Sequence, residues 1–292
     1  MNKHGLLLVD KPKGLVSNQA LKVIKKNMNV KKAGIVGVLD PLASGMLPIV
    51  VGEATKLSKF IENSFKQYNV TMKLGVKSDT GDNEGTLIYD ETPVPQYNNA
   101  LIKDKISEFV GEYSQIPPMH SSIKVSGKKL YDLARKGIEV KRKSRKVKII
   151  NIKLLNYKDD IIELNVNCSK GTYIRTLVED IGKHLGVSAM TDDLRRERVG
   201  EYEESQMVAL SSLIDEKTCM EKLINPSVMV RHLPSITVNN DEEISLRHGM
   251  NICQNTNFID GEVIIQNKIN QVVGIGYIKK GLISPKRLLK ID

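Results

Sequence analysis

Residues 34–51 read GIVGVLDPLASGMLPIVV and place one carboxylate, that of Asp40, in an apolar, glycine-rich loop. Three glycines lie around Asp40, and Pro41 after it disfavours a helical conformation at Asp40. Leu47–Val51 is expected to form a buried strand directly after the loop. A carboxylate in such dry surroundings can act as a nucleophile or a base. Composition alone favours the simpler interpretation, an aspartate in a turn or cap.

On both sides of this loop, short β-rich runs alternate irregularly with helical patterns. The sequence predicts strands at Leu6–Val9, Tyr68–Leu74 and Ile161–Cys168. It predicts helices at Ser17–Lys26 (with Ser17 as the cap), Thr176–Leu185 and Ala209–Leu223. Because the pattern lacks a regular βαβ period, we expect an α+β fold rather than a doubly wound parallel sheet.

The composition of the chain changes around Asn225–Pro234. Short apolar runs punctuated by glycine follow, among them Glu262–Gln266 and Val272–Tyr277. Such runs are typical of a compact β-rich unit. We therefore expect two domains, a larger one formed by residues 1–232 and a small β-rich one formed by residues 233–292.

The charge of the chain points to a polyanionic partner. The 292 residues include 44 Lys+Arg and 34 Asp+Glu, for a formal net charge of +10. Residues 235–292 hold seven Lys+Arg and six Asp+Glu, net +1, so the other +9 lies in residues 1–234. This excess favours nucleic acid as the partner over a membrane surface. The densest basic run, Lys141–Lys148, suits phosphate contacts and a solvated loop equally well.

Several classes of protein are disfavoured by the residues that the sequence lacks. No apolar run approaches the roughly 18 residues of a membrane span, and Gly5–Val9 is too short for the core of a signal peptide. The three cysteines are far apart and the five histidines show no ligand spacing. We therefore expect no disulfide framework and no metal site. The expected protein is cytoplasmic, without membrane association.

The segment SKGTYIRT (Ser169–Thr176) lies where a strand ends and a helix begins, and it places Tyr173 and Arg175 two residues apart. A tyrosine ring can stack on a base that has left its helix, and an arginine can pair with a carboxylate. Both residues also have structural interpretations, a partly buried ring and a partner for a helix acid such as Glu179. Tyr68, at the start of a strand, has the same two interpretations.

Taken together, these segments resemble one known family. They occur in the order GLLLVDKPKG, KAGIVGVLDPLASGMLPIVVGEATK, the strand from Tyr68, SDTG, IPPMHSSIKVSGKKLYDLARKG, CSKGTYIRTL and LRRER, and they cover most of residues 5–200. They are similar to the TruB family, the bacterial tRNA pseudouridine synthases that modify uridine 55 of the T loop. The segment from about Ser235 is similar to a PUA RNA-binding domain.

The resemblance implies a catalytic domain built on a mixed, mainly antiparallel sheet, with tRNA bound through its T arm and no cofactor, metal or DNA involved. The implied reaction detaches uracil from C1′, rotates it and rejoins it through C5. Asp40 matches the catalytic aspartate. It attacks the uridine as a nucleophile or removes a ribose proton to start an elimination, and the sequence leaves both routes open.

The remaining site residues are also carried over from the resemblance. Tyr68 matches the tyrosine that stacks on the flipped base, and Tyr173 and Leu194 match positions that line the pocket. Arg175 matches the arginine that pairs with the catalytic carboxylate. Lys11 matches a motif that supports the active-site loop. Nothing in the sequence points to an obligate protein partner, and we expect a monomer.

One position departs from the family pattern. The family has GHTG before its LDPLA stretch, and the histidine helps to displace the target uridine. Here the four residues are GIVG, with Ile35 in place of the histidine. An isoleucine can act as an apolar wedge, but it neither hydrogen-bonds nor stacks as an imidazole does. The departure bears on base flipping and target preference more than on the chemistry.

Two other functions remain open on the sequence. The first is a related synthase with a different RNA target or with a guide RNA. The second is a tRNA-binding or tRNA-folding protein without catalysis, which the Ile35 departure favours and which the presence of Asp40, Tyr68, Tyr173 and Arg175 argues against.

Overall fold

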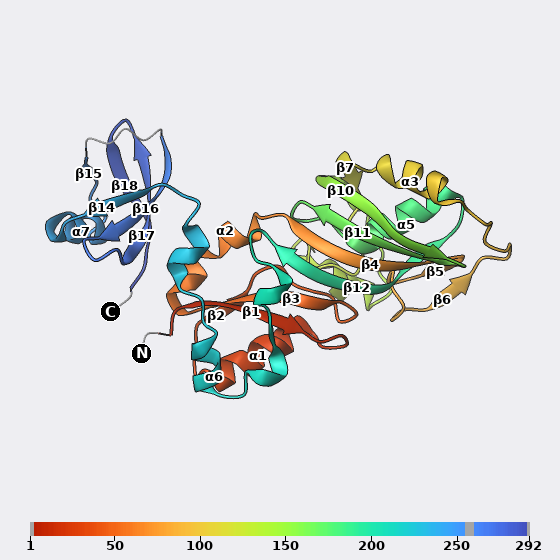
Figure 1. Cartoon of the computed structure of the whole chain (residues 1–292), viewed down its shortest axis with the longest axis horizontal. Coiled ribbons are helices and arrows are strands. Elements are labelled where there is room, and N and C mark those ends of the chain that lie inside the picture. The colour runs from red at the N-terminus through yellow and green to blue at the C-terminus, as the bar shows by residue number, and fades with distance from the viewer. Residues whose placement is uncertain (1–2, 255–259, 291–292) are drawn as a thin grey trace.

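Two separate β-sheets organise the chain, a large one that spans most of the molecule and a small one at one end of its long axis (Figure 1). The structure is a computed structural model, and it describes residues 3–254 and 260–290. The expected α+β architecture is confirmed. No helix in these described ranges combines the length and the apolar character that crossing a membrane requires.

The large sheet has nine strands in the order β13-β1-β3-β12-β4-β11-β10-β7, with β2 also paired to β3. Its pairs are antiparallel except for β1 with β13 and β3 with β12, so it is mixed and mainly antiparallel, as expected. The bounds are β1 (Gly5–Lys11), β2 (Ala33–Ile35), β3 (Ser44–Val51), β4 (Lys66–Leu74), β7 (Gly111–Gln115), β10 (Arg145–Lys158), β11 (Ile161–Cys168), β12 (Ala189–Val199) and β13 (Val208–Ala209).

The inner strands follow the two-residue period of a sheet with one apolar face. In β4 and β11 every second side chain is buried, and all of these side chains except Lys66 join one apolar core. Helices α3 (Asn99–Ser107) and α5 (Ile174–Leu185) cover the sheet near β10–β12, while α1 (Ser17–Asn27) and α6 (Glu216–Glu221) lie together near β2 (Figure 1). Packing of these helices supplies the second layer of the core.

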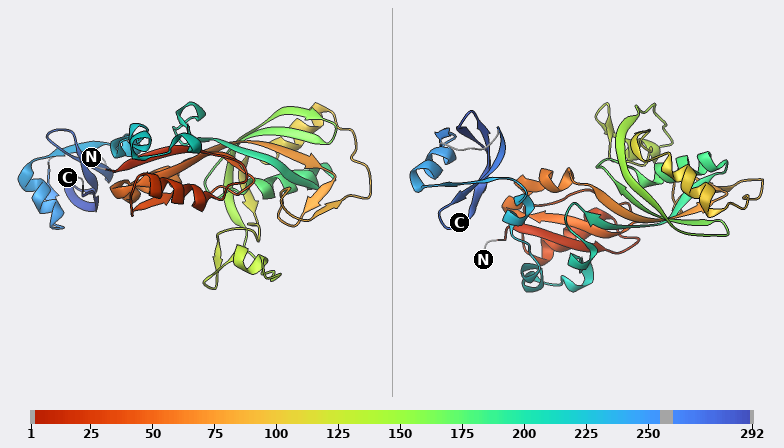
Figure 2. Two further views of the ribbon diagram at one scale, coloured as in Figure 1. Left: turned by 90° about the horizontal axis from the view of Figure 1, so that it is seen from below. Right: turned by 45° about the horizontal axis from the view of Figure 1, so that its top comes forward.

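Short elements connect these layers. They are η1 (Gly52–Leu57), α2 (Ser58–Glu62), the hairpin of β5 (Val76–Ser78) and β6 (Leu87–Tyr89), the hairpin of β8 (Lys124–Val125) and β9 (Lys128–Lys129), α4 (Leu130–Ala134), η2 (Glu204–Gln206), η3 (Leu210–Ser212) and η4 (Pro226–Val230). Figure 2 shows that the segment with β8, β9 and α4 projects away from the large sheet.

Two helix predictions need correction. Ala209–Leu223 is not one helix: β13 ends at Ala209, η3 follows, and α6 begins only after Asp215, whose side chain accepts a hydrogen bond from the Thr218 amide. Helix α1 begins at Ser17 as its first residue, with Val16 at the N-cap position. Ser17 therefore does not cap α1, because its hydroxyl bonds to Leu39 of the Asp40 loop instead.

The small sheet has five strands in the order β14-β16-β17-β18-β15, which confirms the β-rich C-terminal segment. Its elements are β14 (Ser235–Val238), α7 (Asn240–Arg247), β15 (Ile252–Cys253), β16 (Gly261–Asn267), β17 (Val272–Lys279) and β18 (Leu282–Leu288). One apolar cluster lies within this sheet. A second cluster joins Ile264 and Ile275 to Leu6, Leu57 and other residues of the larger part, so the two sheets share buried apolar contacts.

Glu53 forms a polar anchor beside this shared cluster. Its carboxylate accepts hydrogen bonds from Lys32 Nζ at 2.7 Å and from the Lys290 amide at 2.9 Å, and it pairs with Lys56 Nζ at 2.6 Å. Lys56 also donates to the Leu288 carbonyl at 2.7 Å. Burial raises the pKa of Glu53, but the bonds from the two lysines outweigh it and lower the pKa to about 2.

We expect the change Glu53→Gln to lower the free energy of unfolding by about 1–3 kcal/mol at neutral pH, because charge-assisted bonds are lost. A carboxyl group whose pKa is lowered on folding stabilises the fold above its ordinary pKa of 4.5. That stabilisation disappears as the pH falls toward about 2. The difference between wild type and variant, measured by urea unfolding, is therefore expected to shrink below pH 4.5.

Glu112→Gln is the matched control, because Glu112 forms an exposed pair with Lys146 and is expected to contribute less than about 1 kcal/mol. A difference for Glu53→Gln that stays constant between pH 7 and pH 3 would contradict the anchor.

Candidate active site

Asp40 lies in the loop between β2 and β3, and this loop is fixed from behind. Ser17 Oγ donates to the Leu39 carbonyl at 2.7 Å and accepts from the Leu39 amide at 3.0 Å. The Ala43 amide donates to the Asp40 carbonyl at 3.1 Å. Leu39 is buried, whereas the Asp40 side chain is 38% exposed. The backbone of the loop is thus held in place while its carboxylate stays accessible.

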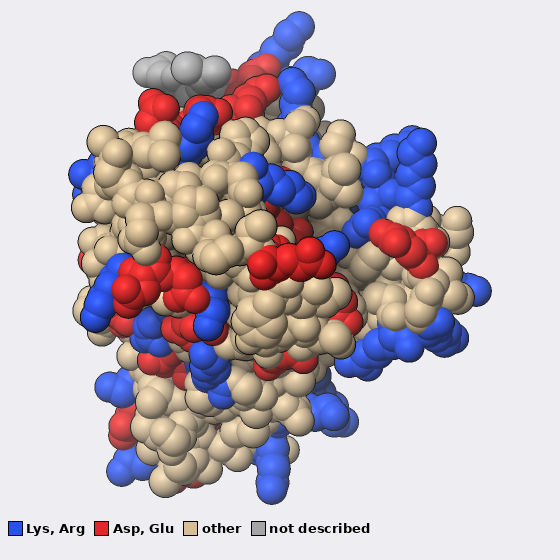
Figure 3. Space-filling view, turned by 90° about the vertical axis from the view of Figure 1, so that its right-hand side faces the viewer, with Lys and Arg blue, Asp and Glu red and all other residues tan. Residues whose placement is uncertain are grey.

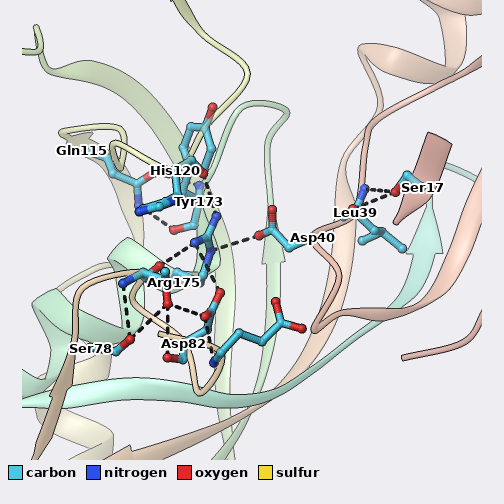
Figure 4. Close-up of polar contacts among 11 residues, drawn as sticks. Ser17, Leu39, Asp40, Ser78, Asp82, Gln115, His120, Tyr173 and Arg175 are labelled. Carbon is cyan, nitrogen blue, oxygen red and sulfur yellow. Dashed lines mark hydrogen bonds and ion pairs between the residues drawn. The ribbon is translucent and has the colours of Figure 1, made fainter. Parts of the chain in front are cut away.

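A buried guanidinium, that of Arg175, holds the Asp40 carboxylate (Figure 4). Arg175 Nε lies 3.0 Å from Asp40 Oδ2, and Nη1 lies 3.3 Å from Asp82 Oδ2. The fork also donates to backbone, Nη1 to the Thr80 carbonyl and Nη2 to the His120 carbonyl at 2.9 Å. All three guanidinium nitrogens are therefore engaged, which fixes the direction of the Asp40 carboxylate.

The start of helix α5 places this arginine. Gln115, at the end of β7, accepts a hydrogen bond from the Tyr173 amide at 2.8 Å and donates to the Tyr173 carbonyl at 2.9 Å. The backbone before α5 is therefore tied to β7, and Arg175 is in the first turn of the helix. Asp82 is 3% exposed, and it lies in the polar turn between β5 and β6.

Lys11 supports the same loop from the end of β1. Its ammonium group is buried and donates to the carbonyls of Leu15 at 2.7 Å, Pro12 at 2.9 Å and Pro41 at 3.3 Å. Burial lowers the pKa of Lys11 to about 8, although the charges of Asp40 and Glu84 act in the opposite direction. Lys11 thus joins the backbone after β1 to the residue that follows Asp40.

Tyr68 and Leu194 lie side by side on one face of the large sheet. In the register of β4 and β12, Tyr68 is opposite Arg196 and Val70 is opposite Leu194. Both predicted residues are buried in the core cluster that also contains Leu39. Burial raises the pKa of Tyr68, while the neighbouring Arg196 lowers it. The phenol is therefore uncharged at neutral pH.

The charge of Asp40 shows that the predicted residues face a common region. It acts on the pKa of Tyr68, of Tyr173 and of Lys11, raising it in each case. Burial is the largest cause of the raised pKa of Tyr173, which lies at the N-cap of α5. Arg175 contacts Asp40 directly, and Lys11 contacts the next residue, Pro41. Tyr68 and Leu194 lie in the core cluster that contains Leu39, and Tyr173 precedes Arg175 by two residues. The structure therefore brings all six predicted residues to one region.

The sequence analysis missed four residues of this site: Ser17 as a loop anchor, Asp82, Gln115 and Arg196. The sequence analysis assigns no role to Asp82, which directly follows the SDTG segment, or to Arg196, which lies within LRRER. Both residues act through contacts with segments that are distant in the sequence, so no local pattern signals them. Within residues 3–254 and 260–290, no three His, Cys, Asp or Glu side chains gather as metal ligands would.

Basic side chains lie around the projecting segment. Most of the run Lys141–Lys148 is exposed, and Arg142 of this run donates to the Pro117 carbonyl at 3.2 Å. Figure 3 looks at the end of the molecule opposite the small sheet, and it shows many Lys and Arg side chains on the right-hand side of the view. Exposed charges of this kind are available for phosphate contacts.

Comparison with known proteins gives consistent matches along the chain. A family model described as "TruB family pseudouridylate synthase (N terminal domain)" matches residues 25–174. A model described as "tRNA pseudouridylate synthase B C-terminal domain" matches residues 175–234, and "Pseudouridine synthase II TruB, C-terminal" matches residues 234–289.

Curated relatives match over nearly the full chain. The tRNA pseudouridine synthase B of Coxiella burnetii (strain Dugway 5J108-111) is 41% identical over 293 residues, covering 98% of this chain and 94% of the relative. That of Vibrio cholerae serotype O1 (strain M66-2) is 40% identical over 300 residues, with 98% and 96% covered.

Solved structures share the fold at lower identity. One, described as an H/ACA RNP bound to a substrate RNA containing 2′-deoxyuridine, has a TM-score of 0.73 at 22% identity and covers 98% of this chain and 85% of that chain. A chain of a Cbf5-Nop10-Gar1 complex has a TM-score of 0.74 at 24% identity, with 97% and 84% covered.

The change Arg175→Met is expected to lower the free energy of unfolding by about 3–5 kcal/mol, because it leaves the buried Asp82 carboxylate without its cation. Urea unfolding followed by circular dichroism measures the loss. Lys13→Met is the control, since Lys13 and Asp193 form an exposed pair expected to contribute less than about 1 kcal/mol. A loss for Arg175→Met no larger than that of the control would contradict the buried pairing.

Proposed function

The chain belongs to the TruB family of pseudouridine synthases, and we propose that it isomerises uridine 55 in the T loop of tRNA to pseudouridine. The observation that carries this proposal is the Asp40 carboxylate, accessible in its loop and held at 3.0 Å by the buried guanidinium of Arg175. The relatives named tRNA pseudouridine synthase B support tRNA as the substrate.

The uridine must leave its stacked loop before Asp40 can reach it, which costs about a few kcal/mol. In our proposal, Tyr68 stacks on the flipped base, and Tyr173 and Leu194 line its pocket. The apolar surroundings of Tyr68 suit this role, because stacking on an aromatic ring offsets part of the cost of unstacking.

Asp40 starts the chemistry by one of two routes. As a nucleophile it forms a bond to C1′ while the C1′–N1 bond breaks. As a base it takes the C2′ proton, and a C1′–C2′ double bond forms as the uracil departs. In both routes the uracil rotates and C5 bonds to C1′. In the first route the Asp40–C1′ bond breaks as this bond forms, and in the second the C1′–C2′ double bond is consumed while Asp40 returns the proton to C2′. The proton on C5 is then lost while N1 gains one. The product is an isomer of the substrate, so no external reactant is consumed.

The other predicted residues position this carboxylate. Arg175 sets the direction of its oxygen atoms, and Lys11 fixes the backbone at Pro41 next to it. A carboxylate held in one direction reduces the reorganisation that the reaction requires. Arg175 and Lys11 are therefore assigned to positioning rather than to bond-making.

The rest of the molecule is assigned to holding the RNA. The exposed basic residues of the projecting segment fix the register of the T arm through phosphate contacts. Residues 233–292 form a PUA-like domain that adds RNA-binding surface, and residues 1–232 form the catalytic domain. The protein acts as a monomer in the cytoplasm.

Asp40→Asn is expected to slow the reaction by at least about 10²-fold, because the amide is neither a nucleophile nor a base. The measurement is tritium release from an unmodified tRNA transcript that carries [5-³H]uridine. Mapping of the product to position 55 tests the target, and binding of labelled tRNA to the variant serves as the folding control. Wild-type protein that binds tRNA but releases no tritium at stoichiometric concentration would instead indicate an RNA-binding protein without catalysis.

Ile35→His is expected to raise the single-turnover rate on a T-loop hairpin several-fold. Ile35 ends β2, five residues before Asp40, and is half-buried against the core cluster. An imidazole at this place supplies the hydrogen bonding and stacking that an isoleucine lacks. Ile35→Ala is the matched control, which removes the apolar wedge without adding polarity. A rate for Ile35→His equal to or below that of wild type would contradict the assignment.

A further inference from the structure

Three buried cations near the site are not paired with any carboxylate of the described chain. Lys11, Lys66 and Arg196 are 0%, 7% and 2% exposed, and in residues 3–254 and 260–290 no Asp or Glu oxygen lies within 4.0 Å of their nitrogens. Their hydrogen-bond acceptors are backbone carbonyls. Arg175, by contrast, contacts two carboxylates.

An unpaired cation inside a protein is expensive, because burial removes its hydration. The two lysines respond to burial with a pKa lowered to about 8, so they can shed part of their charge. A guanidinium keeps its proton under all ordinary conditions. Arg196 is therefore a permanent positive charge in the core, and backbone carbonyls compensate it only in part.

The contacts of Arg196 connect the Asp40 loop and strand β3 to strand β4, which carries Tyr68. Its Nε donates to the Met46 carbonyl in β3 at 2.7 Å, and its Nη2 donates to the Gly37 carbonyl in the Asp40 loop at 2.7 Å. Gly37 has a φ of +76°, and a Cβ there would lie 3.3 Å from Arg196 Nη1, so the glycine lets the guanidinium approach. On the other side, Arg196 is directly opposite Tyr68 in the sheet.

We propose that Arg196 is an electrostatic positioning residue of the base pocket, which fixes the Tyr68 ring relative to the Asp40 loop and stabilises the negative charge of the uracil when it leaves C1′. The proposal rests on the proposed function, since it takes Tyr68 as the platform of the base. Arg196 is not among the residues to which the family resemblance assigns a role.

The chemistry calls for such a charge in both routes open to Asp40. When the C1′–N1 bond breaks, its electron pair stays on the uracil, which becomes an anion until C5 bonds to C1′. A fixed positive charge in low dielectric stabilises this anion more than it stabilises the neutral starting base. The cost of burying the cation is then recovered in part when the anion forms.

Three titratable groups act on the pKa of Tyr68: Arg196 from β12, Cys168 from β11 and Asp40 from its loop. Arg196 lowers the pKa of Tyr68, whereas the other two raise it. Arg196 is therefore the permanent cation among the groups that act on this ring.

Two substrates that differ in how easily the departing base carries negative charge distinguish an electrostatic role of Arg196 from a structural one. The substrates are tRNA transcripts with uridine or with 5-fluorouridine, whose base carries negative charge more easily. Fluorine on C5 cannot leave as a proton does, so the product of that substrate is a C-linked nucleoside that keeps its fluorine. Both products are followed by chromatography of the nucleosides of digested RNA. Arg196→Gln is expected to slow the uridine reaction about 10²-fold but the 5-fluorouridine reaction only about tenfold. Arg196→Lys keeps the charge and is expected to lose less than Arg196→Gln on both substrates.

Arg195→Gln is the matched control, because Arg195 is the neighbouring residue but pairs with Asp10 and Glu204 near the surface. It is expected to stay within about twofold of wild type on both substrates. Equal losses of Arg196→Gln on the two substrates, or an Arg196→Lys variant as slow as Arg196→Gln, would overturn the proposal in favour of a structural role.

A measurement on the free protein keeps this test separate from the proposed function. The ¹³Cζ chemical shift of Tyr68 at neutral pH, measured by NMR with [ζ-¹³C]tyrosine and assigned through Tyr68→Phe, is expected to change in Arg196→Gln and to stay unchanged in Arg195→Gln. An unchanged shift in Arg196→Gln would overturn the proposal even if wild type is active. Inactive wild type with a changed shift in Arg196→Gln would count against the proposed function alone.

Discussion

The arrangement of the site depends on one buried cation with two carboxylate partners. Arg175 is drawn into contact with Asp40, Asp82 and the carbonyls of Thr80 and His120, which belong to segments far apart in the sequence. Each contact satisfies part of a charge that would otherwise be costly to bury. Because a single planar fork makes all of them, the loop after β2, the β5–β6 turn and the segment after β7 must meet in one geometry. The position of the Asp40 carboxylate is a consequence of that geometry.

The backbone of the Asp40 loop is held differently, by donors that contact carbonyls rather than charges. Lys11 reaches the Pro41 carbonyl and Arg196 reaches the Gly37 carbonyl, on either side of Asp40. Carbonyl acceptors fix position without cancelling positive charge. The loop is therefore rigid while Lys11 and Arg196 stay without a carboxylate partner in the described part of the chain, which suits the anionic RNA and the anionic intermediate of our proposals.

Sequence patterns predicted the parts of this structure that rest on local signals. The alternation in Tyr68–Leu74 and Ile161–Cys168 predicted β4 and β11, and the change after Pro234 predicted the small sheet. Strand β12 gave no such signal, since six of its 11 residues are charged although it lies between β3 and β4. Its charges are accommodated by partners from distant segments, as Arg196 is by Gly37 and Met46. The motif resemblance supplied Asp40 and Arg175, but Asp82 and Arg196 follow only from three-dimensional contacts.

The shared apolar cluster links the two sheets through the same strands that build the site. It includes Leu6 of β1 and Met46 of β3 together with Ile275 of β17. Met46 is also the residue whose carbonyl accepts from Arg196, so its side chain contacts one region and its backbone the other. A displacement of the small sheet would disturb β3, and β3 begins directly after the Asp40 loop. In our proposal, RNA that binds both parts experiences one fixed spacing between them, which favours a substrate of defined shape over a flexible strand.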